Sequence, residues 1–172
     1  MRSTKEENKA LCRKYPFLIP SNRFSGKRIT EGAGSRPGSP EVSSGYDWEY
    51  TELDSMPDGW RTAFGEQMCE ELKTALIKAD LLDRYRVMDI KEKYGHLRWY
   101  DNGGTRIVKE IISKYEEISK RICICCGRRA TLIALGWISP YCDSCVPDNE
   151  RTVPVKKYYD TTEVDHNDLF DV

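Results

Sequence analysis

Apolar residues recur at helical spacing in two stretches of the chain. Between 57 and 81 the recurring residues are Trp60, Phe64, Met68, Leu72, Leu76 and Ala79. Steps of three and four positions predict a helix with one buried face. Ser55 and Asp58 match a capping box before it, and Pro57 suits its first turn. A second helix near 105–121 is predicted by Ile107, Ile111, Tyr115, Ile118 and Ile122.

The residues between these two helices follow a strand pattern instead. Tyr85–Tyr94 is rich in β-forming residues, Gly95–His96 supplies a turn, and Leu97–Tyr100 returns. Asn102–Gly104 then ends the element. We therefore expect an α+β fold in which the apolar stripes of both helices pack against one face of an antiparallel hairpin.

The two ends of the chain differ in composition from this core, which is predicted to span 46–122. Residues 1–20 end in an apolar patch that is expected to dock on the core as a short extended segment, namely Tyr15, Phe17, Leu18 and Ile19. Residues 21–45 are rich in Gly, Ser and Pro and predict a flexible loop. Residues 147–172 are acidic and lack periodicity, so a loosely attached tail is expected there.

The cysteines are concentrated in one short stretch. The chain has seven, and all but Cys12 and Cys69 lie between 123 and 145. Cys123-x-x-Cys126-Gly127 has the form of a zinc knuckle, and Cys142-x-x-Cys145 supplies a second pair, at the short edge of a spacing common in zinc sites. The intervening residues can form a hairpin that turns at Gly136. Residues 123–146 are therefore predicted to be a zinc ribbon or a treble-clef-like module.

Four thiolates fill a tetrahedral shell, so the predicted site is closed and structural rather than catalytic. Redox-active thiols and buried, unligated cysteines are the alternatives. Cys125 is expected to be an extra thiol that points away from the metal, although it could replace Cys123 or Cys126 as a ligand. Cys69 is expected to be a small core residue, and nothing in the sequence gives Cys12 a role.

Composition favours a protein of the cytoplasm. The first residues contain no apolar signal region, and no stretch is apolar for long enough to predict a membrane span. Thiols stay reduced in that compartment, which favours metal binding over disulfides. The formal net charge is −1, a balance much less basic than that of most generic nucleic-acid-binding proteins.

The small net charge hides alternating blocks. Residues 1–37 and 76–130 are basic, whereas 38–75 and 131–172 are acidic. Basic and aromatic side chains on or near the hairpin and the knuckle are candidate contacts for nucleic acid or a protein partner, namely Arg84, Arg86, Lys91, Lys93, Arg98, Trp99, Arg128 and Arg129. The alternative is a solvated face whose cations pair with Asp89, Glu92 and the acidic block.

Several strings resemble a family of small proteins from phages and prophages of Firmicutes. They are "YPFLIPSNRFSG", "YTELDSMPDGWRTAFGEQMCEEL", "IKEKYGHLRWYDNG" and "GWISPYCDSC". Members share a Lys-Glu-Lys-aromatic-Gly-x-Leu-Arg-aromatic hairpin, here Lys91–Trp99, followed by a helix and two cysteine pairs. The resemblance covers most of 13–146 and implies an origin, but no enzymatic activity is assigned to that family. Cys125 and the long acidic tail depart from its pattern.

Three functional hypotheses follow. The first is a non-enzymatic, zinc-stabilised protein of phage or prophage origin that engages a host or phage protein in the bacterial cytoplasm, with inhibition of host nucleic-acid machinery or defence as an extension. The second is a nucleic-acid-binding regulator that uses the basic hairpin and the zinc ribbon. The third is a metal-dependent, HNH-like nuclease, which the Asp165–His166 pair suggests. The position of this pair disfavours the hypothesis, because it lies beyond the last cysteine rather than between the two cysteine pairs. His96 is expected to be an exposed turn residue rather than a base.

Overall fold

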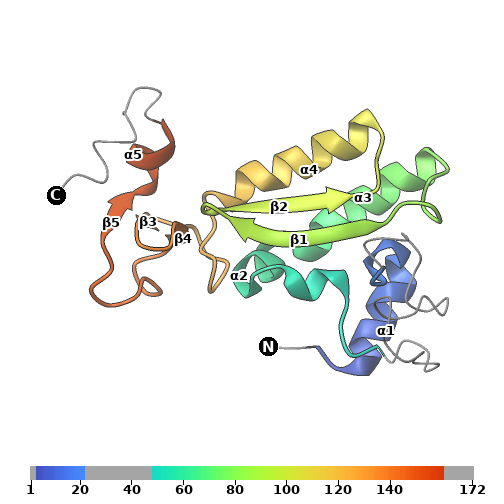
Figure 1. The fold of residues 1–172 in the computed structure, drawn as a ribbon, viewed down its shortest axis with the longest axis horizontal. Helices are drawn as coiled ribbons and strands as arrows, with labels where there is room; N and C mark the ends of the chain where they lie inside the picture. The colour runs from blue at the N-terminus through green and yellow to red at the C-terminus, as the bar shows by residue number, and fades with distance from the viewer. Residues whose placement is uncertain (1–2, 22–47, 161–172) are drawn as a thin grey trace, which may run out of the picture.

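The computed structural model describes residues 3–21 and 48–160 (Figure 1). Its helices are α1 (Lys5–Lys14), α2 (Asp58–Trp60), α3 (Glu66–Lys78), α4 (Arg106–Ser119) and α5 (Val155–Asp160). Its strands are β1 (Val87–Lys93), β2 (His96–Asp101), β3 (Leu132–Ala134), β4 (Ser139–Tyr141) and β5 (Thr152–Pro154). The predicted α+β class is confirmed. Apart from Ser21, the predicted loop 21–45 lies outside the described residues, as does the tail beyond 160.

The helix predicted over 57–81 is present from Asp58 to Lys78. It consists of α2, a π-helical stretch at Arg61–Gly65, and α3. The predicted stripe is buried at Trp60, Phe64, Met68, Leu72 and Leu76. The predicted capping box is wrong, since the N-cap of α2 is Pro57, without a side-chain cap. Ser55 instead ends a 3-10 helix, Glu52–Ser55, whose own capping residues are Thr51 and Asp54.

The hairpin forms as predicted, but its turn lies one residue earlier. His96 pairs with Lys93, which leaves Tyr94 and Gly95 as the two loop residues. Both have positive φ, 52° and 80°, as a type I′ turn requires. Glycine tolerates this conformation without cost, whereas Tyr94 is an unusual occupant.

Helix α4 packs against β2 and α3 (Figure 1). The predicted Tyr115 is buried, and Ile111, Ile118 and Ile122 pack partly buried against the core, but the centre of the buried face lies about one residue from the predicted stripe. The buried residues are Val108, Ile112, Tyr115 and Ser119, while Ile107 is 60% exposed. Thr105 caps the helix through the Val108 N–H, so the helix begins at Arg106. The helix is rotated by about one residue from the predicted orientation, and this turns Ser119 towards the hairpin.

Side chains of α4 satisfy the outer edge of β2. The Leu97 N–H donates to Ser119 Oγ at 2.8 Å, and the Trp99 N–H donates to Glu116 Oε1 at 3.2 Å. Ser119 Oγ also donates to the Glu116 carbonyl at 2.7 Å. A helix therefore covers the β2 edge, which would otherwise be open to pairing with another strand.

The N-terminal segment docks on the core, but not in an extended form. A capping box between Thr4 and Glu7 starts α1, and a 3-10 turn at Pro16–Leu18 follows it. Phe17 and Leu18 are fully buried in the main core. The sequence signal for α1 was the Thr-x-x-Glu pattern at its start.

Residues 152–160 fold, although the sequence predicted a loose tail from 147 onwards. Strand β5 pairs with β3 on the side opposite β4, giving the order β4-β3-β5. Val155 at the start of α5 is buried beside Ile133 and Ala130. The predicted hairpin of the C-terminal module is confirmed, and it gains a third strand. No helix in the described part of the chain has both the length and the apolar character needed to cross a membrane.

Two buried serines make a matched test of the α4–hairpin contact. Replacing Ser119 with alanine leaves the buried Leu97 N–H without an acceptor, so we expect a loss of about 1–3 kcal/mol in the free energy of unfolding. The hydroxyl of Ser139 is equally buried but has no hydrogen-bond partner among the described residues. Ser139→Ala should therefore leave stability unchanged or raise it. Chemical denaturation measures both values, and equal losses would contradict the proposed role of Ser119.

Candidate metal centre

The first cysteine pair lies on a tight knuckle directly after α4. The Gly127 N–H donates to the Cys123 carbonyl at 3.0 Å, and the Cys123 N–H donates to the Arg128 carbonyl at 2.7 Å. Gly127 has a φ of +77°, which a residue with a side chain rarely adopts. This backbone turn brings Cys123 and Cys126 to one side.

The second pair follows β4. The N–H groups of Cys145 and Val146 both donate to the Cys142 carbonyl, at 3.0 and 3.1 Å. The two knuckles are joined by the β3–β4 hairpin, and the Ile124 N–H donates to the Pro140 carbonyl at 2.9 Å. The hairpin thus returns the second pair to the first.

The four sulfurs of Cys123, Cys126, Cys142 and Cys145 lie within 4.8 Å of one another. Cys126 Sγ and Cys142 Sγ are 3.6 Å apart, close to the edge of about 3.8 Å that a tetrahedron with zinc–sulfur bonds of about 2.3 Å would have. The cysteines are free, and this separation is far longer than a disulfide bond of about 2.05 Å. These are the four residues that the spacing selects, and together they could hold one metal ion.

Arg128 supplies positive charge beside this cluster. Its Nε donates to Cys126 Sγ at 3.4 Å, and its Nη2 donates to Cys142 Sγ at 3.6 Å. The hydrogen bond from Arg128 lowers the pKa of Cys126 to about 6. Hydrogen bonds to Cys126 and Cys142 raise the pKa of Cys145 to about 12. Metal binding must therefore displace a proton from the cluster, because thiolates are the ligands.

The remaining cysteines lie apart from the four. Cys125 is exposed and does not belong to the group of clustered sulfurs, and partial desolvation raises the pKa of its thiol. Cys12 and Cys69 are buried in the main core. Burial raises the pKa of Cys69 well above its usual value, as expected for a small core residue.

The first knuckle rests on the start of α2. The Gly59 N–H donates to the Ile124 carbonyl, and Trp60 Nε1 donates to the Ile122 carbonyl, both at 2.9 Å. A Cβ atom at Gly59 would lie only 2.2 Å from the Cys123 carbonyl oxygen. Glycine is therefore required at 59, because the knuckle backbone occupies the place of a side chain.

The predicted contact residues do not form one surface. Lys91, Lys93 and Arg98 lie on the outward face of the hairpin, where Lys91 pairs with Asp89, and Arg98 with Glu116 at 3.2 Å. Trp99 is only 5% exposed, on the opposite face, and its Nε1 donates to Tyr85 Oη.

The other predicted contacts lie elsewhere. Arg84 and Arg86 donate to backbone carbonyls before β1. Arg129 is exposed, and Arg128 faces the sulfurs.

The described histidine, His96, does not belong to the cysteine cluster. His96 begins β2 and is half-buried, with Nδ1 3.2 Å from the Tyr94 carbonyl oxygen. Desolvation lowers its pKa. His166 lies outside the described residues. Within 3–21 and 48–160, the four clustered cysteines are the only group of three or more potential metal ligands.

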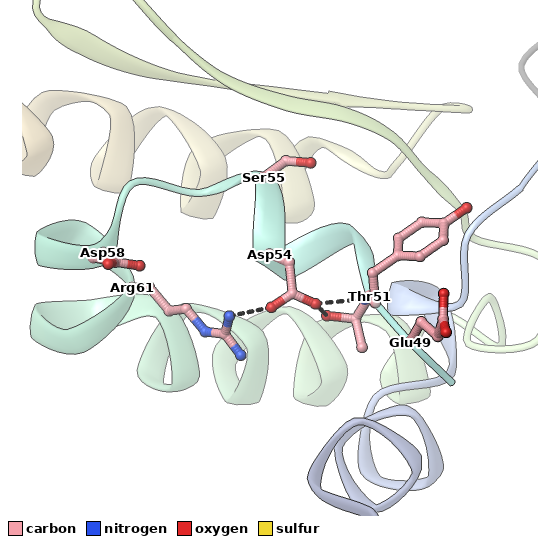
Figure 2. A pocket seen from close by; sticks show the side chains of 7 residues that line it. Glu49, Thr51, Asp54, Ser55, Asp58 and Arg61 are labelled. Atoms are coloured by element: carbon pink, nitrogen blue, oxygen red, sulfur yellow. Dashed lines mark hydrogen bonds and ion pairs between the residues drawn. The ribbon is translucent and has the colours of Figure 1, made fainter. Parts of the chain in front are cut away.

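A polar hollow of about 540 Å³ lies beside the 3-10 helix that precedes α2 (Figure 2). In this view the Arg61 guanidinium reaches the carboxylate of Asp54, which also accepts the Thr51 N–H. The hollow was not predicted from sequence, although Thr51-x-x-Asp54 was the available signal. The contacts of Asp54 with Thr51 and Arg61 fix the turn before α2. They therefore help to position the helix on which the first knuckle rests.

Comparison with known protein families, with curated proteins and with solved structures finds no match to this chain. The functional assignment therefore depends on the geometry of the site and on the chain's own residues.

Gly59 and Gly65 allow a direct test of the contact between the knuckle and the helix. Gly59→Ala places a Cβ against two backbone carbonyls of the knuckle, so we expect a loss of at least about 2 kcal/mol in the free energy of unfolding. The nearest atoms to a Cβ at Gly65 lie 3.5 Å away, which is ordinary contact. Gly65→Ala should be neutral or stabilising by about 0.5–1 kcal/mol, since helical alanine costs less entropy. Similar losses in both variants, measured by denaturant titration, would contradict the role of the close approach.

Proposed function

We propose that Cys123, Cys126, Cys142 and Cys145 hold one Zn²⁺ ion, and that its role is structural. A tetrahedral set of four thiolates is typical of zinc or of an iron–sulfur centre. The set leaves no open position for water or substrate, unlike the sites of zinc enzymes. The adjacent small sheet has a limited apolar core, and metal binding would supply the free energy that it lacks.

Metal content tests this assignment, with Cys125 as an internal control. We expect one zinc ion per chain in reduced wild-type protein and in Cys125→Ser, by native mass spectrometry. Cys123→Ser should lose the ion and unfold at a lower temperature, because the cluster would retain only three thiolates. An unchanged melting curve in Cys123→Ser, or wild-type protein without metal, would contradict a structural zinc.

We further propose that the protein is a non-enzymatic binding module for another protein. The observation that carries this proposal is the closed sulfur set fastened to the core at Gly59, which supports a rigid scaffold rather than a reaction centre. The resemblance to phage and prophage proteins supports a host or phage protein as the partner, in the bacterial cytoplasm. The acidic tail favours an extended role, in which the protein competes for a nucleic-acid-binding surface of host machinery or defence.

Affinity capture from bacterial lysate tests the partner. Full-length protein is compared with a variant of equal length in which Glu163→Gln, Asp165→Asn, Asp168→Asn and Asp171→Asn remove tail charge. We expect one host or phage protein that resists nuclease treatment, with retention reduced severalfold in the variant if the tail competes for a basic surface. Enrichment of nucleic acid that weakens steeply with salt would instead favour the nucleic-acid-binding alternative. No enriched partner would count against the proposal.

A further inference from the structure

Two turns that are distant in sequence meet at the junction of the hairpin and the C-terminal module (Figure 1). One is the β1–β2 turn at Tyr94 and Gly95, and the other is the β3–β4 turn. Trp137 Nε1 donates to Glu92 Oε2 at 3.1 Å, and Tyr159 Oη donates to the Gly95 carbonyl at 3.3 Å. The first contact joins the β3–β4 turn to β1, and the second joins α5 to the β1–β2 turn.

A hollow of about 310 Å³ lies between the two turns. It is lined by Glu92, Lys93, Tyr94, Gly136, Trp137 and Ile138. Trp137 is 75% exposed and Tyr94 is 66% exposed. Large aromatic side chains are usually buried, and tryptophan and tyrosine are enriched among the residues that dominate binding energy at interfaces.

The chemistry of the hollow selects for a cation. The single donor of the Trp137 indole is already used by Glu92, so this side chain offers its π faces to a ligand. Glu92 forms no ion pair with any residue in the described part of the chain, and its other carboxylate oxygen accepts the Gly95 N–H at 2.7 Å. The Lys93 ammonium lies over the Tyr94 ring, 5.6 Å from its centroid, whereas the indole has no such cation among the described residues. An aromatic face and a carboxylate that forms no ion pair within residues 3–21 and 48–160 therefore lie side by side.

We propose that this hollow, which we call the Trp137 hollow, binds an arginine side chain of a protein partner. A guanidinium can stack on an indole face and also donate to a carboxylate, and it is less strongly hydrated than an ammonium. A second carboxylate, Glu150, lies close by and accepts the Gly136 N–H at 2.8 Å. The lining also holds one cation, Lys93, so Glu92 and Glu150 together leave a net negative charge that favours a cationic ligand and disfavours the phosphates of a nucleic acid. This inference depends on the proposed function as a protein-binding module and names the chemistry that the partner must present.

The indole N–H of Trp137 gives a direct signal for this binding in ¹⁵N-labelled, full-length, metal-loaded protein. Loss of one indole peak in Trp137→Phe assigns it. The probe is an acetylated Gly-Arg-Gly amide, and the control peptide carries citrulline, which is nearly isosteric but neutral. We expect a saturable shift with the arginine peptide that weakens with salt, and at least about tenfold weaker binding of the citrulline peptide, the factor that about 1.4 kcal/mol supplies.

Two variants test the site, one within the Trp137 hollow and one outside it as a control. Glu92→Gln removes the charge and keeps one oxygen, which can accept from either Gly95 or Trp137 but not from both, and we expect it to weaken arginine binding at least about tenfold. Tyr100→Ala removes a partly exposed aromatic ring from the outward face of β2, outside the Trp137 hollow, and should leave binding unchanged.

Three results would overturn the arginine site: no saturable shift with the arginine peptide, equal shifts with citrulline, or binding that Glu92→Gln leaves intact. A stronger shift with a short oligodeoxythymidine would overturn it in favour of base stacking. Metal content and melting temperature of Glu92→Gln, together with capture of the partner, report on the proposed function separately. The arginine site can therefore fail while the zinc-stabilised binding module stands.

Discussion

The rest of the C-terminal architecture depends on one close backbone contact, between the first cysteine knuckle and the start of α2. A Cβ atom at Gly127 would lie 2.6 Å from the Gly59 carbonyl oxygen, and one at Gly59 would meet the Cys123 carbonyl. Two glycines therefore let two backbones touch where side chains would separate them. The helix that begins there also carries Trp60 and Phe64 into the main core. The sulfur cluster and the core are in this way parts of a single packed unit.

This contact matters because the module beyond it can bury little by itself. Its hydrophobic cluster consists of Ala130, Ile133 and Val155 with a few partly buried neighbours, whereas the main cluster contains most of the buried aromatic and aliphatic residues. Small folds of this kind usually need a metal or a disulfide to offset their chain entropy. The backbone contact with a well-packed helix helps to meet that need, and the metal ion proposed for the four sulfurs would add to it. The β5 strand adds hydrogen bonds to β3 but little apolar area.

The parts of this fold that residue spacing alone determines could be predicted from the sequence. Two Cys-x-x-Cys pairs joined by a short hairpin leave few arrangements, so the four clustered sulfurs could be predicted. The face of α4 could not, because Ile107 and Val108 are both apolar and only the contact of Ser119 with Leu97 decides between them. Likewise, strand β5 has only three residues, and its pairing with β3 is a tertiary contact without periodicity.

The Trp137 hollow was harder to predict for the same reason. Trp99 lies within β2 and Trp137 in the turn between β3 and β4, and the sequence alone does not show which of the two is exposed. Trp99 is buried because its position in the hairpin register faces the core, beside Ile90. Trp137 follows Gly136 in a turn that abuts a second turn, and its indole is held at the surface by a carboxylate from β1. Removing the Glu92 carboxylate from water would cost free energy. Because Glu92 holds the Trp137 indole, the indole stays near solvent together with the carboxylate, whereas Trp99 has no charged partner on its indole nitrogen. An aromatic ring held in that way is already ordered before a ligand binds, which lowers the entropic cost of ordering the side chain on binding.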